Sequence, residues 1–180
     1  IIVRDTSGPV IVAPPVVLEY PSDTGTNVTG VPIIQDGCGS VTALAYSDIV
    51  SNSCGGTKFV ARTWTATDAS GNTSSRAQVI LVKDTTPPTL LCSPNISLLA
   101  GQPLCFQEPL ARDNCSAVTV RLVCTSTNAL NQLTNLITRT WVAIDACGNT
   151  ATGQQTLIVP IPPPIIAPTI ITQPQSQVAG

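Results

Sequence analysis

Cysteine is the residue type with the most chemistry to offer in this sequence. Seven cysteines occur, at positions 38, 54, 92, 105, 115, 124 and 147. None belongs to a Cys-x-x-Cys pair, and the sequence has no histidine, so the usual zinc ligand sets are missing. The sparse, irregular spacing predicts disulfides and no metal. Because disulfides form in oxidising compartments, we expect an extracellular or cell-surface protein.

Groups that catalyse reactions are scarce. Without histidine, the commonest general base near neutral pH is absent, which excludes Ser-His-Asp and Cys-His nucleophiles. A Ser-Lys pair or paired carboxylates stay formally open, but the chain has only two lysines and its acids are dispersed. There is no glycine-rich phosphate loop and no basic patch with aromatic residues. We therefore expect a protein that is not an enzyme.

The charge and hydropathy of the chain restrict its partners. It carries 8 Lys and Arg against 10 Asp and Glu, a formal net charge of −2, which predicts no binding to nucleic acid. Only 10% of the residues are charged, and the mean hydropathy is +0.30. No apolar run approaches the roughly 18 residues of a membrane span. The apolar surplus must be covered otherwise, and we expect contacts between copies or attached sugar.

Aspartates offer a second kind of site. Asp68 and Asp145 each begin a segment of the form Asp-Ala-x-Gly-Asn, and Asp5 and Asp84 each precede a threonine in similar linkers. One interpretation is calcium held by Asp68, Asp84 and Asp145 at a domain junction, because Ca²⁺ takes several oxygen ligands. The simpler interpretation, which we favour, is that Asp68 and Asp145 bond their own backbone and form turns. On that interpretation the chain holds no cofactor.

These residues recur because the chain contains an internal repeat. Arg62–Val82 aligns without gaps on Arg139–Val159 at an offset of 77, with 11 identical residues among the 21. The same offset places Asp36–Cys38 on Asp113–Cys115. Internal repeats indicate that one structural unit is used more than once. We expect a domain at residues 5–83 and another at 84–160, flanked by an extended strand at 1–4 and a Pro-rich extended segment at 161–180.

Strands must position the side chains of both repeats. Thr, Val and Ile dominate, turn residues recur about every 8–12 residues, and no segment has a helical period. The predicted fold is all-β, with two tandem Ig-like antiparallel sandwiches and extended terminal strands. Trp64 and Trp141, one in each repeat, are expected in the cores. The expected strands are 9–13, 16–20, 41–46, 57–67, 75–82, 89–92, 96–100, 103–107, 117–124, 136–144 and 153–160.

Both ends of the chain look unfinished. Ile1, Ile2 and Val3 read as the last strand of a domain whose body is missing. The end of the chain, which contains Ile165, Ile166, Ile170 and Ile171, reads as the first strand of another domain. It is either a stiff polyproline linker or a strand donated to the open sheet edge of a neighbouring copy. A head-to-tail contact of that kind does not close and produces a filament.

Several motifs resemble those of the hyalin-repeat (HYR) family and its bacterial Ig-like relatives. They are "DTTPPTLLCSPNISL", "ARDNCSAVTV" and "TRTWVAIDACGNTAT", and they cover most of residues 84–160 and, more weakly, 5–83. The resemblance implies β-sandwich modules of extracellular multidomain proteins without catalytic residues. Such repeats often have a cysteine where this chain has Gly153, and that cysteine often pairs with the position of Cys92. The resemblance therefore implies that Cys92 has lost its partner.

Disulfide pairing is predicted within each repeat. The first repeat has only Cys38 and Cys54, and a turn at Ser47–Ser53 makes Cys38–Cys54 feasible. In the second, a Cys115–Cys124 bond is rejected, because the two residues lie roughly 30 Å apart if the run between them is an extended strand. An Ig-like layout favours Cys105–Cys124. Of the remaining cysteines, Cys115–Cys147 with Cys92 free is preferred, and Cys92–Cys147 is the alternative.

The functional prediction is a structural subunit of a surface fibre or pilus-like filament, which binds copies of itself. The alternative is a stalk or an adhesion fragment of a larger surface protein. A site for carbohydrate or protein on loops would have to use aromatic residues such as Tyr20, Tyr46 or Phe106. Sequons predict N-glycans, which would be attached at Asn27, Asn72, Asn95 and Asn114.

Overall fold

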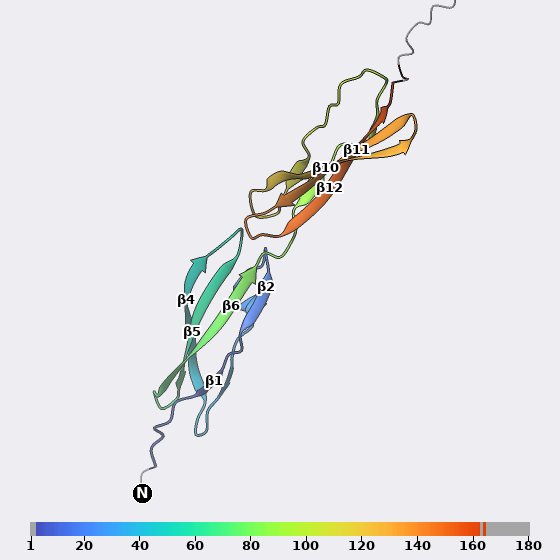
Figure 1. The fold of residues 1–180 in the computed structure, drawn as a ribbon. Helices are drawn as coiled ribbons and strands as arrows, with labels where there is room; N and C mark the ends of the chain where they lie inside the picture. Colours follow the sequence, from blue (N-terminus) through green and yellow to red (C-terminus); the bar gives the residue numbers. More distant parts are fainter. Residues whose placement is uncertain (1–2, 163, 165–180) are drawn as a thin grey trace, which may run out of the picture.

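Two β-sandwiches lie end to end along an elongated molecule (Figure 1). The computed structural model describes residues 3–162 and 164. Strands β1 to β6 form the first sandwich and β7 to β12 the second, and the described residues contain a single helical turn, α1 (Thr26–Thr29). The strand bounds are β1 Val10–Val12, β2 Val16–Glu19, β3 Ile33–Gln35, β4 Val41–Asn52, β5 Lys58–Asp68, β6 Thr73–Lys83, β7 Thr89–Leu91, β8 Ile96–Ser97, β9 Leu110–Arg112, β10 Thr119–Asn131, β11 Thr134–Ile144 and β12 Thr150–Pro160.

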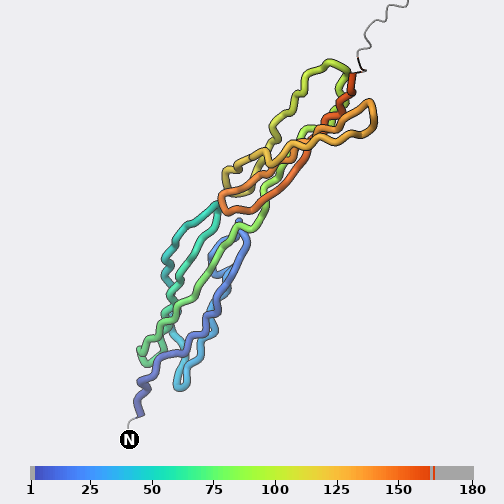
Figure 2. Tube along the Cα trace, viewed as in Figure 1, coloured from blue at the N-terminus to red at the C-terminus, as the bar shows by residue number. Residues whose placement is uncertain are grey.

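The two sandwiches share one topology. In the first, a four-stranded sheet has the order β2-β6-β5-β4, and β1 pairs with β3 in a two-stranded sheet. In the second, the orders are β8-β12-β11-β10 and β7-β9. In both, the short second strand runs parallel to the last strand, whereas the other pairs are antiparallel. This arrangement confirms the predicted all-β fold of two tandem sandwiches, and the traces of the two halves can be compared in Figure 2.

A period of two places alternate residues of β5 in the core. Val60, Arg62, Trp64 and Ala66 are buried, while the residues between them are more exposed. Trp64 packs with Ile11 and Ala13 from the first strand and its loop, so the two sheets of the first sandwich meet face to face. In the second sandwich Trp141, Ala143 and Leu157 are buried. Both tryptophans therefore lie in cores.

Several strand predictions need correction. The predicted turn at Ser47–Ser53 is absent. β4 instead continues to Asn52 and pairs with β5 along its whole length. Residues 103–107 form no strand, and β9 begins later, at Leu110. β3 and α1 were not predicted. β3 is too short to show the alternating pattern of the long strands, and α1 is too short to show a helical period.

β6 ends at Lys83 and β7 begins at Thr89. The domain bounds of 5–83 and 84–160 stay a prediction. Of the residues predicted to join copies, Ile1, Ile2, Ile165, Ile166, Ile170 and Ile171 lie outside the described residues. Val3 is described and is 91% exposed. In the part of the chain that the structure covers, no helix has the length and apolar character needed to cross a membrane.

Candidate functional site

A disulfide joins the two sandwiches. Cys54 lies at the tip of the β4–β5 hairpin, Ser53–Thr57, and is bonded to Cys147 in the turn between β11 and β12. The two Cα atoms are 4.9 Å apart, and 93 positions separate the residues in the sequence. Gly55 has a φ of +52°, a left-handed conformation that favours glycine, and it brings the hairpin tip against the second sandwich.

Hydrogen bonds fix the linker that crosses this junction. The Thr57 hydroxyl accepts a bond from the backbone N–H of Asp84 at 3.1 Å, and it lies 3.6 Å from the Cys147 sulfur. On the first sandwich, the Glu19 carboxylate accepts bonds from the N–H and hydroxyl of Thr85 at 2.8 and 2.7 Å. These bonds lower the pKa of Glu19. The linker is therefore tied to the first sandwich at two points, the β4–β5 hairpin and the end of β2.

The structure corrects the predicted disulfide pairing. Cys38 and Cys54 lie at opposite ends of β4, whose 12 residues span roughly 40 Å, far beyond the reach of a disulfide. Cys147 bonds with Cys54, so it pairs with neither Cys115 nor Cys92. Cys105 and Cys124 are exposed and unpaired, since residues 103–107 do not enter the sheet.

Cys92 is unpaired and lies beside Gly153. Its sulfur lies 2.5 Å from the position that a Cβ on Gly153 would occupy. A cysteine at 153 would therefore face Cys92 directly. Burial raises the pKa of the Cys92 thiol.

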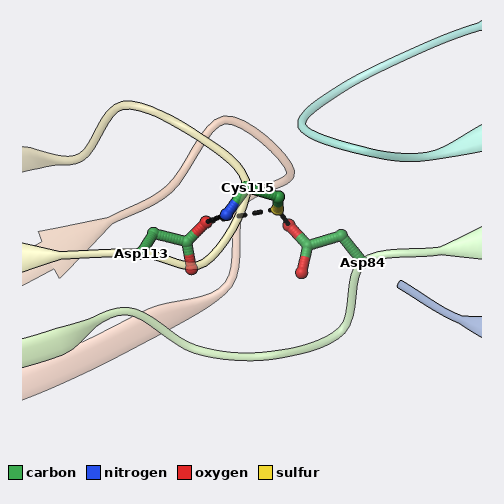
Figure 3. Close-up of side chains that lie close together, drawn as sticks. All are labelled: Asp84, Asp113 and Cys115. Carbon is green, nitrogen blue, oxygen red and sulfur yellow. Dashed lines mark hydrogen bonds between the residues drawn. The ribbon is translucent and has the colours of Figure 1, made fainter. Parts of the chain in front are cut away.

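Cys115 lies beside the inter-sandwich bridge, between two aspartates (Figure 3). Its sulfur is 2.9 Å from Asp84 Oδ2 and 3.2 Å from Asp113 Oδ2. Burial and then the Asp84 carboxylate raise the pKa of the thiol to about 12. At neutral pH this group is a thiol, which donates to the carboxylates and is a poor nucleophile.

An equivalent acidic cluster, formed by Asp5, Asp36 and Asp68, lies at the other end of the first sandwich. One oxygen in each cluster, Asp5 Oδ2 and Asp113 Oδ1, is buried without a hydrogen-bond partner. The predicted calcium set is not brought together, because Asp68 and Asp84 belong to different clusters and Asp145 to neither. Carboxylate oxygens suit Ca²⁺, so the cluster of three aspartates has the better donor set.

Asp68 and Asp145 form turns in the same way. Asp68 Oδ1 accepts bonds from the backbone N–H of Ser70 and Asn72, both at 2.8 Å. Asp145 Oδ1 accepts from Cys147 and Asn149 at the same distance. Burial raises the pKa of Asp68, but hydrogen bonds from the Asn72 side chain and from the backbone N–H groups of Asn72, Ser70 and Gly71 outweigh it and leave that pKa below its ordinary value.

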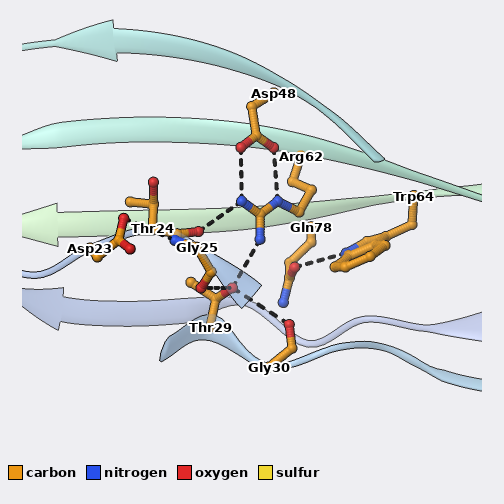
Figure 4. Close-up of polar contacts among 9 residues, drawn as sticks. All are labelled: Asp23, Thr24, Gly25, Thr29, Gly30, Asp48, Arg62, Trp64 and Gln78. Atoms are coloured by element: carbon orange, nitrogen blue, oxygen red, sulfur yellow. Dashed lines mark hydrogen bonds and ion pairs between the residues drawn. The ribbon is translucent and has the colours of Figure 1, made fainter. Parts of the chain in front are cut away.

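An arginine completes the core of the first sandwich (Figure 4). Arg62 is 1% exposed and forms a two-pronged ion pair with Asp48, with both N···O distances at 2.8 Å. It also donates to the Thr29 hydroxyl and the Thr24 carbonyl. The segment that contains α1 thus covers the arginine. No sequence pattern predicts a buried arginine at this position.

The second sandwich repeats the arginine, tryptophan and glutamine of this core but not the bonds that they make. At the offset of 77, Arg139 replaces Arg62 and Thr125 replaces Asp48, so the carboxylate is missing. Arg139 lies over the ring of Phe106 at 4.3 Å, and its Nε has no partner. Trp141 Nε1 and Gln155 Oε1 are also unpaired, although the corresponding atoms of Trp64 and Gln78 bond at 2.9 Å. The second core is therefore less completely bonded.

Both four-stranded sheets end in a long free edge. Among the described residues, β4 pairs only with β5, and β10 only with β11. Nearly every residue of both edge strands is exposed. Large apolar side chains lie on them, namely Leu44, Tyr46, Ile49 and Val50 on β4, and Leu122, Val123 and Leu130 on β10. Unpaired edges of this length can accept another strand.

The remaining predicted residues are dispersed. Asn27, Asn95 and Asn114 are exposed, whereas the Asn72 side chain donates to Asp5, Ser7 and Asp68. The aromatic residues form no common surface. Tyr20 packs against Gly56 and Tyr46 lies between Arg62 and Trp64, whereas Phe106 lies in the second sandwich.

Comparisons with known proteins give no family. No protein-family model matches, so the hyalin-repeat resemblance stays a prediction, and the search of curated proteins finds no match. Among solved structures, the chain is similar to protocadherin gammaB7 EC3-6, described as a cis-dimer, with 15% identity, a TM-score of 0.33 and coverage of 87% of this chain. It spans about half of that protein, 51%. It is also similar to human mucin-like protocadherin EC1-2, with 10% identity, a TM-score of 0.31 and coverage of 84% and 97% of the two chains. Likeness at this level establishes no shared function.

Proposed function

We propose that this protein is a non-catalytic extracellular structural module whose copies join head to tail by strand addition. The observation that carries this proposal is the free edge of β4, 12 residues long and lined with exposed apolar side chains. A monomer that exposes such an edge risks uncontrolled aggregation, unless the edge has a partner. The disulfide between Cys54 and Cys147 supports an oxidising, extracellular location.

The donated strand is the C-terminal segment of a neighbouring copy. Residues 165–180 carry four isoleucines and no charged side chain, so their burial costs little desolvation. Sixteen extended residues reach about 50 Å, enough to follow the whole of β4. The segment follows β12, which ends at Pro160. In a head-to-tail arrangement, the first sandwich of the next copy lies beyond that end of the second sandwich. We therefore place it on β4 of that copy rather than on β10.

Deletion and substitution test this assignment. Deletion of residues 165–180 should leave a monomer in sedimentation experiments, because the donor is lost. Ile49→Lys, at a position that is 76% exposed on β4, should also weaken assembly. Val123→Lys on β10, at a site that is 59% exposed, is the matched control. Unchanged assembly after the deletion would disprove strand donation and favour the alternative, a stalk or adhesion fragment of a larger surface protein.

A second proposal concerns calcium. We infer that the cluster of Asp5, Asp36 and Asp68 binds Ca²⁺, since Asp5 Oδ2 is buried without a partner and no cation of the described chain pairs with these carboxylates. Bound calcium would supply the positive charge that three adjacent carboxylates lack. Isothermal titration calorimetry should detect binding that Asp36→Asn weakens. Equal binding by that variant would exclude this site.

A further inference from the structure

The two sandwiches have the same surface at the end where the chain enters them, and this surface is called the pole. The pole consists of a linker that begins with aspartate, an Asp-x-Cys loop and the turn that follows the fifth strand. These segments are 5–7, 36–38 and 68–72 in the first sandwich, and 84–86, 113–115 and 145–149 in the second.

Corresponding atoms make corresponding bonds in the two poles. The Asn149 side chain donates to the Asp84 carbonyl at 3.2 Å, and Asn72 donates to the Asp5 carbonyl at 3.4 Å. In the Asp-x-Cys loops, the backbone N–H of Cys115 donates to Asp113 at 3.0 Å, and that of Cys38 donates to Asp36 at 3.3 Å. The poles are therefore alike in structure as well as in sequence.

The pole of the second sandwich is already a docking surface. The hairpin tip Ser53–Thr57 of the first sandwich lies against it, and a Cβ added to Gly55 would lie 3.0 Å from Asp84 Oδ2, 3.1 Å from the Cys115 sulfur and 3.2 Å from the Cys147 sulfur. The pole of the first sandwich has no such cover among the described residues. It borders a cavity of about 390 Å³, lined by residues 3–7, Cys38 and Ser70.

A matching hairpin tip lies at the opposite end of the molecule, between β10 and β11 (Figures 1 and 2). The pairs Asn52↔Lys58 and Ala129↔Asn135 are equivalent at the offset of 77, so the segments 53–57 and 130–134 have equal length. The second segment is more tightly closed, because Asn131 at the end of β10 still pairs with Thr134 at the start of β11. Asn131 thus corresponds to Cys54. The second tip exposes Leu130 by 56% and Leu133 by 65%, as expected for a contact surface without its partner.

We propose that the 130–134 tip of one copy docks on the pole of the first sandwich of the next copy, in the way that the 53–57 tip docks within the chain. This contact rests on the proposed function and specifies its geometry. Asn131 would face Ser70, which corresponds to Cys147. Because neither is a cysteine, the contact between copies is not covalent. The contact inside each chain is locked by a disulfide.

An engineered disulfide tests this geometry. Asn131→Cys and Ser70→Cys are combined in the full chain with Cys38→Ser, which removes the other thiol from the pole. After mild oxidation of assembled protein, we expect a ladder of covalent multimers on a non-reducing gel. Peptide mapping should show the link between positions 131 and 70. The matched control replaces Ser70→Cys with Ala77→Cys, an exposed site on β6 away from the pole, and should give no ladder through position 77.

The outcomes separate this inference from the proposed function. Filaments that form without the 131–70 link would overturn the docking geometry and leave strand addition standing. A monomeric chain would overturn both. A second variant, Leu133→Glu, keeps the result independent of oxidation, because a charge at the exposed tip should weaken end-to-end joining without disturbing the fold. Unchanged filament length in that variant would also contradict the inference.

Discussion

Removal of the inter-sandwich disulfide should cost the protein a large part of its stability. The double variant Cys54→Ser/Cys147→Ser removes both sulfurs, so that Cys115 gains no new partner. The bridge closes a loop across 93 positions. The chain-entropy model gives about 4.5 kcal/mol for a loop of this size, or roughly three powers of ten in the unfolding equilibrium.

Urea denaturation of the monomeric deletion variant measures this effect. With an m-value of about 2 kcal/mol/M, the transition midpoint should fall by roughly 2 M. Cys38→Ser is the control, because Cys38 is exposed and unpaired and corresponds to Cys115 at the first pole. It should change the unfolding free energy by less than about 0.5 kcal/mol. Equal midpoints for the double variant and the control would refute the bridge between sandwiches.

Four further predictions follow from the contacts described above. Asp48→Asn should destabilise the first sandwich by about 3 kcal/mol in urea because Arg62 keeps a buried charge without its partner, whereas Thr125→Asn at the corresponding position should have little effect. Gly153→Cys should form a new bridge with Cys92 and raise the unfolding free energy by about 2–4 kcal/mol, and free thiols still present at both positions would contradict this geometry. The pKa values of Asp68 and Asp113 lie below the ordinary 3.8. Both carboxylates therefore stabilise the folded protein above pH 3.8, and this stabilisation is lost as the pH falls through their pKa values in the folded state. Acid titration of the unfolding free energy should show this loss, and Asp68→Asn should reduce it. Calcium should raise the melting temperature of the native chain, and the increase should shrink in Asp36→Asn but persist in Asp113→Asn.

The repeat made much of the fold predictable. The offset of 77 correctly relates the long strands of the two sandwiches, and Trp64 and Trp141 lie in cores as expected. Asp68 and Asp145 form the predicted turns because an aspartate can bond backbone groups two residues away, a local property that sequence reveals.

Contacts between the repeats could not be read in the same way. The pairing of Cys54 with Cys147 depends on how the two sandwiches meet, whereas each predicted pair of cysteines lies inside one repeat. Cys54 corresponds to Asn131, so no pattern marked it as special. The length of β4 was underestimated because Ser47 and Asp48 resemble turn residues, although Asp48 instead serves the buried Arg62. The cover that α1 provides over Arg62 likewise has no local signal.

Electron microscopy of the unaltered chain, residues 1–180, tests the central claim most directly. If copies join head to tail by strand addition, the images should show unbranched filaments in which one chain is the repeating unit. Filaments should disappear when residues 165–180 are deleted. A uniform population of separate two-sandwich monomers at high protein concentration would contradict the claim that this protein assembles with itself.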